Sequence, residues 1–280
     1  MPTTTLLVID PQNDFCDLSP IAFNGSDATP GTPASPALPV PGANADMTRL
    51  AAFIQRNATR IDSVITTMDT HSPYDIGHSS YWIGADGSQP TPFYAITSEE
   101  LLAKKWFPRD PTQKDWVTRY ALAVEAQGFR GIEIWPEHCI GGTWGHAVHE
   151  EVMKALIAWS RGQGKAVNYV FKGLNPNTES YSAVEAVVPI FSDKSTQYNL
   201  ALADQLGDSS LVIVAGEALS HCVASTMRSV LKEGRVKPSR VVMLTDCMSP
   251  VGGFENAATS FMSEMAEQGV RFANSANFNF

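Results

Sequence analysis

The segment LVIVAGEALSHCVAST, residues 211–226, places an apolar run directly before a small-residue turn and a helical pattern. The apolar residues 211–215 are typical of a strand that is buried on both faces of a parallel sheet. A helix is expected over residues 220–233, immediately after the turn. Because a strand, a turn and a helix follow one another in this order, the segment predicts an α/β fold.

The same alternation continues along the rest of the chain. Further short apolar runs predict strands at residues 6–9, 63–67, 166–171, 240–244 and 270–273. Helical patterns separate several of them, at residues 44–55, 200–206 and 253–268. We therefore expect a parallel sheet of about six strands, each buried on both faces.

Two segments do not follow this alternation of strands and helices. Residues 17–41 are rich in Pro, Ser, Ala and Gly and predict a surface loop. Residues 83–131 contain helical pieces and many aromatic residues. We expect this second segment to be an insertion beside the sheet, within a single domain that spans residues 1–280. Long excursions of this kind often form lids or binding loops.

The composition narrows the classes of function. With 280 residues and 44% hydrophobic content, the chain can bury one large core. Its net charge of −9 argues against a nucleic-acid partner or an anionic membrane. The start of the chain lacks the features of a signal peptide, and no apolar stretch approaches the roughly 20 residues of a membrane span. We therefore expect a soluble, cytoplasmic protein.

The cysteines must be interpreted one by one. Cys16, Cys139, Cys222 and Cys247 lie far apart and form no CxxC pair. A disulfide framework or a structural zinc site is therefore not expected.

Reactive side chains follow several of the predicted strands. Asp10 follows the first, Asp69 and His71 the second, Lys172 the third, and the turn 216–222 the fourth. Ligands of open α/β sheets bind beyond the carboxyl ends of the strands. We therefore expect these residues, distant in sequence, to meet at one edge of the sheet.

Cys222 is a candidate nucleophile because it lies near the start of a predicted helix, where the helix dipole stabilises a thiolate. Asp10 could serve as its general base, and Lys172 could pair with Asp10 and favour the thiolate. Each residue also has a plainer interpretation: a buried structural cysteine, a loop carboxylate, and a strand-end lysine.

Asp69 and His71 are candidate metal ligands, because residues i and i+2 of an extended segment point the same way. His138 is a candidate third ligand and His78 a possible fourth. Nitrogen and oxygen ligands suit zinc, iron or manganese, although solvated loop residues would give the same pattern. Two further histidines, His146 and His149, fall on a helix expected after GGTWG and should be exposed there.

In chain order these segments resemble the nicotinamidase branch of the isochorismatase-like cysteine hydrolases. The matching motifs are LLVIDPQNDF, ALPVPGA, MDTHSPYDIGHSSYW, WPEHCIGGTWGHAVH, VFKG with a following YSAV, GEALSHCV and TDCMSP. They span almost the whole chain. The resemblance implies a three-layer α/β/α sandwich around the parallel sheet. It also implies the hydrolysis of nicotinamide to nicotinate and ammonia, a step of NAD salvage, through a thioester on Cys222.

The resemblance also implies roles for individual residues. The catalytic triad would be Asp10, Lys172 and Cys222. The backbone N–H groups of Ala218 and Cys222 would form the oxyanion hole, after a cis peptide between Glu217 and Ala218. One divalent metal ion, zinc with iron or manganese as alternatives, would be held by Asp69, His71 and His138, with His78 as a further candidate. An aromatic substrate would lie between Phe15 and Trp135.

Some features depart from the family pattern. The segment before the cysteine, GEALSHC, differs from the usual G-(V/L)-A-T-D-Y-C, and the insertion is large. The alternatives are therefore a related amidase that acts on another carboxamide or carbamoyl substrate, and a non-catalytic binding protein on the same fold. By the same resemblance, the partners would be a small-molecule amide and further copies of the chain in a homo-oligomer.

Overall fold

The computed structural model of the protein describes residues 3–21 and 33–280. At its centre lies a six-stranded parallel sheet with strand order β10-β9-β8-β1-β2-β7. The strands are β1 (Thr4–Ile9), β2 (Ser63–Asp69), β7 (Asn168–Lys172), β8 (Leu211–Gly216), β9 (Val241–Leu244) and β10 (Arg271–Ala273). All six strands predicted from the sequence are thus present, and the parallel α/β fold is confirmed.

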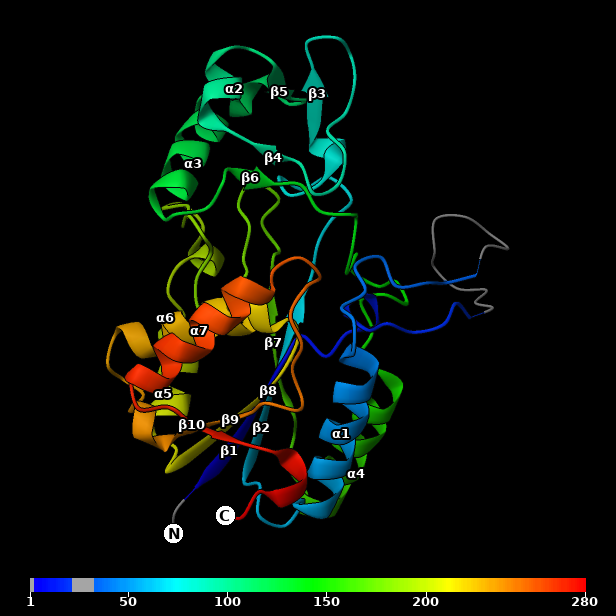
Figure 1. The fold of residues 1–280 in the computed structure, drawn as a ribbon, viewed down its shortest axis with the longest axis vertical. Coiled ribbons are helices and arrows are strands. Elements are labelled where there is room, and N and C mark those ends of the chain that lie inside the picture. The colour runs from blue at the N-terminus through cyan, green and yellow to red at the C-terminus, as the bar shows by residue number, and fades with distance from the viewer. Residues whose placement is uncertain (1–2, 22–32) are drawn as a thin grey trace.

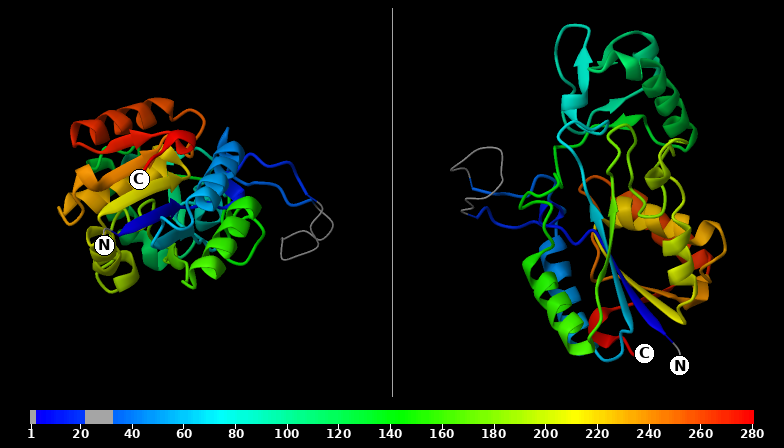
Figure 2. Two further views of the ribbon diagram at one scale, coloured as in Figure 1. Left: turned by 90° about the horizontal axis from the view of Figure 1, so that it is seen from below. Right: turned by 180° about the vertical axis from the view of Figure 1, so that it is seen from behind.

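Helices cover both faces of the sheet, which gives the three expected layers (Figures 1 and 2). One face carries α1 (Ala43–Arg56) and α4 (Glu150–Gln163). The other carries α5 (Leu200–Gly207), α6 (Ala224–Lys232) and α7 (Glu255–Glu267). Leu6 and Val8 of β1 belong to the first core, and Leu7 and Ile9 belong to the second. This alternation is the period of two that a strand imposes on its side chains.

The edge strand β7 departs from the expectation that every strand is buried on both faces. Tyr169 is 36% exposed and Phe171 is 53% exposed. No strand pairs with the outer side of β7 in the described part of the chain, and the preceding helix α4 packs mainly against α1. The expectation of full burial is therefore wrong for β7, and it is wrong for the other edge strand, β10, in which no residue is fully buried.

The histidines that precede α4 also differ from their prediction. The helix begins at Glu150, where two acidic residues complement the positive end of its dipole. His149 is only 4% exposed, and its Nε2 lies 3.0 Å from Asn44 Oδ1. His146 lies in the turn before the helix and is half-buried. The expectation that both histidines sit exposed on a helix is therefore wrong.

The predicted loop 17–41 lies partly outside the described residues, because 22–32 are not among them. Its last part is not a surface loop. Leu38 and Val40 are buried in the main core, and their N–H groups donate to the carbonyls of Asp14 and Phe15. Here the chain closes over the end of β1.

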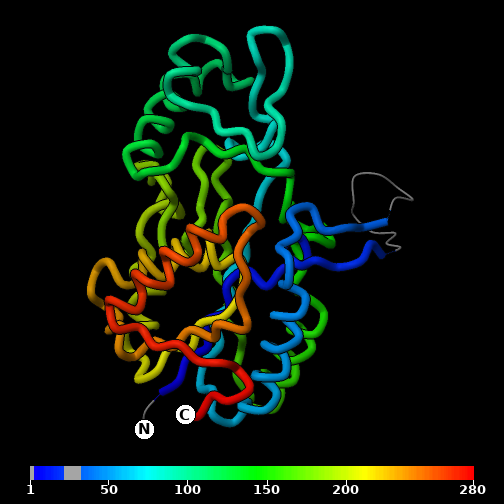
Figure 3. The backbone as a smooth tube through the Cα atoms, in the orientation of Figure 1, coloured from blue at the N-terminus to red at the C-terminus, as the bar shows by residue number. Residues whose placement is uncertain are grey.

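Residues 82–133, which contain the segment predicted to be an insertion, form a lobe beyond the carboxyl ends of the strands (Figure 1). Figure 3 traces the chain from β2 into this lobe and back toward β7. Two antiparallel pairs, β3–β5 and β4–β6, flank two helices. The elements are β3 (Trp82–Gly84), β4 (Ala95–Ile96), α2 (Ser98–Leu102), β5 (Trp106–Pro108), α3 (Lys114–Ala126) and β6 (Ile132–Glu133).

The lobe has its own hydrophobic cluster, in which Tyr81, Trp82, Trp106 and Tyr120 are buried. This cluster accounts for four of the aromatic residues of segment 83–131, namely Tyr94, Trp106, Trp116 and Tyr120, whereas Phe93 and Phe129 are exposed. The helical pieces expected in the segment are present as α2 and α3. Among the helices of the described residues, none is long and apolar enough to cross a membrane.

Candidate active site

Four of the candidate residues converge at the carboxyl edge of neighbouring strands. Asp10 follows β1, Asp69 ends β2, Lys172 ends β7, and Cys222 follows β8. The Lys172 ammonium lies 2.9 Å from Asp10 Oδ2, 2.9 Å from Asp69 Oδ1 and 3.6 Å from Cys222 Sγ. The structure therefore brings together the residues that the sequence places at separate strand ends.

The cluster lies where the strand order changes direction. In chain order, the strands that follow β1 are placed first on one side of it, as β2 and β7, and then on its other side, beginning with β8. The boundary between β1 and β8 is therefore the topological switch point of the sheet. Gly216 makes the close approach there possible. Its φ is +127°, and a Cβ at this position would lie 2.0 Å from the carbonyl oxygen of Ile9. A side chain at residue 216 would therefore push the Cys222 loop away from Asp10.

Lys172 is the positive charge that two buried carboxylates share. Burial alone would lower the pKa of Lys172, but the charges of Asp10 and Asp69 raise it well above its ordinary value. The side chain is therefore a permanent cation. For Asp10, burial raises the pKa, and Lys172 opposes this rise.

Asp10 is positioned by backbone and side-chain contacts together. Its φ of +41° is rare for a residue other than glycine. The backbone N–H of Asp10 donates to Thr67 Oγ1 at 3.0 Å, and the Thr67 hydroxyl donates to Asp10 Oδ1 at 2.5 Å. The second carboxylate oxygen is thus left to face Lys172 and Cys222.

Cys222 is 5% exposed and lies in a single π-helical turn, Leu219–Val223, that continues into α6. Burial raises the pKa of the Cys222 thiol well above its ordinary value, although the Lys172 cation lowers it. Burial thus outweighs the effect of Lys172, which the sequence suggested would favour a thiolate. The resting side chain is a thiol, and Asp10 is a base beside it.

The peptide bond between Glu217 and Ala218 is cis, as the resemblance implies. The neighbouring N–H groups are used elsewhere: that of Leu219 donates to Ser249, and that of His221 donates to Ala218. In the described residues, the backbone N–H of Ala218 has no partner, and that of Cys222 has none outside its own turn. Ala218 and Cys222 line one cavity, so both groups are suited to bind an oxyanion.

Glu217 is a fully buried carboxyl group beside the cis peptide. Its Oε2 accepts a hydrogen bond from the N–H of Ser249 at 3.0 Å. Burial, and then the negative charge of Asp46, raise the pKa of Glu217 well above its ordinary value. Glu217 is therefore held as a neutral acid over a wide range of pH.

This burial makes stability depend on pH. The native state keeps a proton on Glu217 that the unfolded chain, with its ordinary carboxyl pKa, releases above about pH 4.5. The free energy of unfolding should therefore fall as pH rises, by about 1.4 kcal/mol per pH unit from this group while the native carboxyl stays protonated. In Glu217→Gln this contribution should vanish. The free energy of unfolding of the variant, relative to that of the wild type, should therefore increase as pH rises. Urea unfolding between pH 5 and 8 measures the slope.

The matched control is Glu267→Gln, the same chemical change at an exposed site. It should leave the slope of the wild type unaltered. Equal slopes for the wild type and Glu217→Gln would contradict the assignment of a neutral Glu217.

Asp69, His71 and His138 lie close enough together to bind one metal ion. One ligand atom from each falls within 4.8 Å of the others, and all three residues are buried. His71 Nε2 lies 3.2 Å from Asp69 Oδ1, and His138 Nε2 lies 3.6 Å from Asp69 Oδ2. His78 is adjacent rather than part of this group, with its ring centroid 5.2 Å from that of His71.

The hydrogen bonds of these histidines fit a metal site. In each ring Nδ1 faces an oxygen that can only accept a hydrogen bond, so Nδ1 carries a proton and Nε2 is the atom left for a metal. The acceptors are Asp75 Oδ2 at 3.1 Å for His71, the carbonyl of Pro136 at 2.8 Å for His138, and that of Ser72 at 3.2 Å for His78. Within residues 3–21 and 33–280, the Nε2 atoms of His71 and His78 are buried and have no hydrogen-bond partner. Zinc, iron and manganese all accept such imidazole nitrogens beside a carboxylate.

The charges around the site also favour a cation. Burial alone would lower the pKa of His71, but Asp69 and Asp75 raise it well above its ordinary value. The buried carboxylate of Glu179, which the sequence did not single out, lies 3.9 Å from His71 Nε2. A divalent cation would compensate these carboxylates in place of a proton. Burial and the neighbouring histidines lower the pKa of His78 to about 4, so His78 stays neutral.

The candidate nucleophile and two of the metal candidates, Asp69 and His138, line the same cavity. Phe15 and Trp135, the predicted substrate contacts, line it together with Cys222. Sequence reasoning missed several other lining residues, which are Leu38, Glu179, Tyr181, His221 and Val251. The YSAV motif contains Tyr181, and His221 precedes the cysteine, so both had a signal in the sequence. Leu38 also had one, because it lies in the ALPVPGA motif, whereas Glu179 and Val251 had none.

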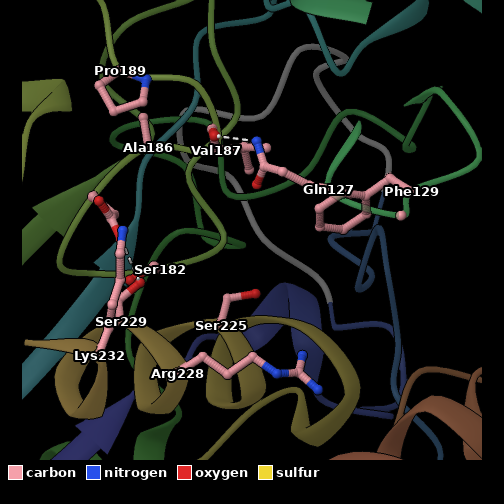
Figure 4. A pocket seen from close by; sticks show the side chains of 12 residues that line it. Gln127, Phe129, Ser182, Ala186, Val187, Pro189, Ser225, Arg228, Ser229 and Lys232 are labelled. Atoms are coloured by element: carbon pink, nitrogen blue, oxygen red, sulfur yellow. Dashed lines mark hydrogen bonds and ion pairs between the residues drawn. The ribbon is translucent and has the colours of Figure 1, made fainter. Parts of the chain in front are cut away.

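A second, larger hollow of about 700 Å³ lies between α6 and the loops at residues 127–129 and 182–189 (Figure 4). Its basic residues on α6 are already paired, Arg228 with Glu264 and Lys232 with Glu185. None of the site residues predicted from the sequence lines this hollow.

Comparisons with known proteins give matches in structure alone. No model of a protein family matches the chain, and no curated protein sequence matches it. The fold is similar to that of a nicotinamidase/pyrazinamidase of Acinetobacter baumanii, with a TM-score of 0.61 and 21% identity, covering 99% of this chain and 98% of that one. It is similar to the yeast nicotinamidase, with a TM-score of 0.61 and 19% identity, covering 97% and 100%.

A third similar structure is the pyrazinamidase of Pyrococcus horikoshii in complex with zinc, with a TM-score of 0.53 and 18% identity, covering 98% of this chain and 99% of that one. These matches extend over nearly the full length of both chains in each pair. The chain therefore has the fold of the nicotinamidases and pyrazinamidases.

Proposed function

We propose that the protein is a metal-assisted cysteine amidohydrolase that converts nicotinamide and water to nicotinate and ammonia. One observation carries the proposal. In a buried cluster, the Lys172 ammonium contacts Asp10, Asp69 and Cys222 at once, at 2.9, 2.9 and 3.6 Å. A thiol, a base and a fixed cation in one cavity are the groups that nucleophilic attack on an amide needs. The fold shared with nicotinamidases supports the choice of substrate.

In the first half of the reaction, Asp10 accepts the proton of the Cys222 thiol while Lys172 stabilises the negative charge. The sulfur attacks the carboxamide carbon, and the carbonyl oxygen becomes an oxyanion. The N–H groups of Ala218 and Cys222 donate to it. One such donor typically stabilises a transition state by about 2.7–4 kcal/mol. Collapse breaks the C–N bond, Asp10 returns its proton to the leaving nitrogen, and ammonia departs from a thioester.

In the second half, Asp10 accepts a proton from water, and the resulting hydroxide attacks the thioester carbon. The same N–H groups of Ala218 and Cys222 hold the oxyanion. The C–S bond breaks, the carboxylic acid leaves, and the proton returns from Asp10 to Cys222. Lys172 keeps its charge throughout, because Asp10 and Asp69 hold its pKa high.

Asp69, His71 and His138 would hold the metal, with His78 as a further candidate ligand. When bound, the metal supplies a Lewis acid at one wall of the cavity. Zinc is the proposed ion, because the ligand set suits it and a structural neighbour is a zinc complex; iron and manganese suit the same ligands. Phe15 and Trp135 would flank the aromatic ring of the substrate. The proposed setting is NAD salvage in the cytoplasm, by a single-domain chain that forms a homo-oligomer.

The test is ammonia release from nicotinamide by the purified protein, before and after treatment with a chelator. We expect one ammonia for each nicotinate formed, a loss of activity after chelation, and recovery when zinc is returned. A panel of other carboxamides and carbamoyl compounds is run in parallel. Turnover of a panel member without turnover of nicotinamide would support a related amidase. No ammonia from any compound would indicate a binding protein.

A further inference from the structure

Glu217 is the first residue at which the turn before Cys222 departs from the family pattern, which has valine or leucine there. It directly precedes Ala218, and the proposed mechanism gives it no role. Its side chain is 0% exposed. A carboxyl group is costly to bury where an aliphatic side chain would fit, unless a hydrogen-bond partner compensates the loss of water. The partner of Glu217 therefore shows what the side chain contributes.

The partner is Ser249, which is bonded to the residues on both sides of Ala218. The N–H of Ser249 donates to Glu217 Oε2 at 3.0 Å, and the carbonyl of Ser249 accepts from the N–H of Leu219 at 2.8 Å. Among the residues that the structure describes, no other acceptor is bonded to the N–H of Ser249. Ala218 thus lies between two residues that are both attached to Ser249.

Ser249 and Glu217 are each anchored to the main core. The hydroxyl of Ser249 donates to Asp46 Oδ2 at 2.5 Å, and the other oxygen of this carboxylate is paired with Arg49. The backbone N–H of Glu217 donates to the carbonyl of Ile9 at the end of β1, at 2.8 Å. The contact between Glu217 and Ser249 therefore completes a continuous chain of hydrogen bonds from β1, through the turn after β8, to helix α1.

A neutral carboxyl group suits this contact. Burial, and then the negative charge of Asp46, raise the pKa of Glu217 well above its ordinary value. The protonated group can accept from the N–H of Ser249 without placing a second negative charge beside Asp46. It also places none beside the oxyanion that would form at Ala218.

We propose that Glu217 is a positioning residue, which holds the N–H of Ala218 in place for the oxyanion through its contact with Ser249. This inference rests on the proposed function, in which that N–H stabilises the oxyanion. The oxyanion forms only when the thiol attacks, so the contact acts on the transition state rather than on the bound substrate. Without the contact, the substrate should bind almost as well and react more slowly.

The experiment compares the wild type with Glu217→Leu and Glu217→Gln in steady-state assays of ammonia release from nicotinamide. Leucine fills the site without an acceptor for Ser249, whereas glutamine keeps a neutral acceptor oxygen. We expect kcat to fall about 10-fold to 100-fold in Glu217→Leu, with KM changed by less than about 3-fold. Glutamine should recover most of this loss.

Two further variants serve as controls. Leu156→Ala shortens a buried side chain of α4 outside the cavity, so it lowers stability and should leave kcat unaltered. Ser249→Ala releases Ser249 from Asp46 but keeps its backbone N–H, and it should lower kcat less than Glu217→Leu does. It provides a milder form of the same test if leucine prevents folding.

Two measurements do not depend on the hydrolysis of nicotinamide. Nicotinaldehyde can add reversibly to the Cys222 thiol: the sulfur bonds to the carbonyl carbon, and the carbonyl oxygen takes the thiol proton and lies where the oxyanion would form. Its affinity should fall in Glu217→Leu by a factor similar to that of kcat. Hydrogen exchange at the N–H of Leu219, which is bonded to Ser249, should be faster in the same variant.

The outcomes distinguish this inference from the proposed function. Loss of aldehyde affinity in Glu217→Leu, in a protein that releases no ammonia, would retain the role of Glu217 and reject the hydrolase. A rise in KM alone, an equal fall of kcat in Leu156→Ala, or a glutamine variant no better than leucine would overturn the inference. Unchanged aldehyde affinity or unchanged exchange at Leu219 would do the same and leave Glu217 a packing residue.

Discussion

Replacing Cys222 with alanine should abolish ammonia release, lowering turnover by about 10⁴-fold or more. The thiol is the atom that would form the thioester, and among the cysteines of the described residues only Cys222 has its sulfur in contact with Lys172. The fold should persist, because the substitution removes one sulfur atom from a site that already adjoins a cavity. The metal content should also persist, because the Asp69–His71–His138 cluster does not include the thiol. Steady-state ammonia assays, circular dichroism and elemental analysis measure the three quantities.

Cys247→Ala is the matched control, since Cys247 is an equally buried thiol outside the cavity. It should keep its turnover. Substantial hydrolysis by Cys222→Ala, or loss of activity in both variants alike, would show that the nucleophile lies elsewhere.

Replacing Lys172 with methionine should damage both stability and activity. Methionine fills a similar volume but leaves Asp10 and Asp69 facing each other without a cation. Removing one partner from a buried ion pair typically costs about 3–5 kcal/mol. The loss of free energy of unfolding should grow with pH, because the two carboxylates would then remain protonated only in the native state. Turnover should fall to background, since nothing would stabilise the developing thiolate.

Urea unfolding at several pH values tests this prediction. Lys232→Met is the control, because that lysine is 59% exposed and its pair with Glu185 is worth at most about 1 kcal/mol. Adding Asp10→Asn to Lys172→Met should restore part of the stability without restoring turnover. Equal and small losses for the two lysine variants would refute the shared-cation interpretation of Lys172.

The meeting of the main candidate site residues at one edge of the sheet could be predicted from the sequence. Apolar runs bounded by helices identify parallel strands, and the carboxyl ends of parallel strands meet at one edge. Asp10, Asp69, Lys172 and Cys222 each follow such a run, so their convergence follows from topology alone. The resemblance added the cis peptide between Glu217 and Ala218, which no strand pattern indicates.

What could not be predicted depends on packing between distant segments. The burial of Leu38 over β1, the exposure of Phe171 on an edge strand, and the position of His149 before α4 are set by which elements happen to cover them. The protonated state of Cys222 is another such case. Helix position and a nearby lysine suggested a thiolate, but the degree of burial decides the balance, and burial is a property of the folded chain.

The lobe above the sheet has a consequence for the order in which the protein can fold. Strands β2 and β7 are neighbours in the sheet, yet the chain between them runs from Thr70 to Val167 and includes the whole lobe. Bringing the ends of so long a flexible segment together would be slow, because the entropy of closure opposes it. The lobe buries its own aromatic core and pairs its strands locally, so it can become ordered first. The flexible part of the chain that joins β2 to β7 would then be shorter. The insertion would then speed the pairing of β2 with β7, the step that brings Lys172 beside Asp69.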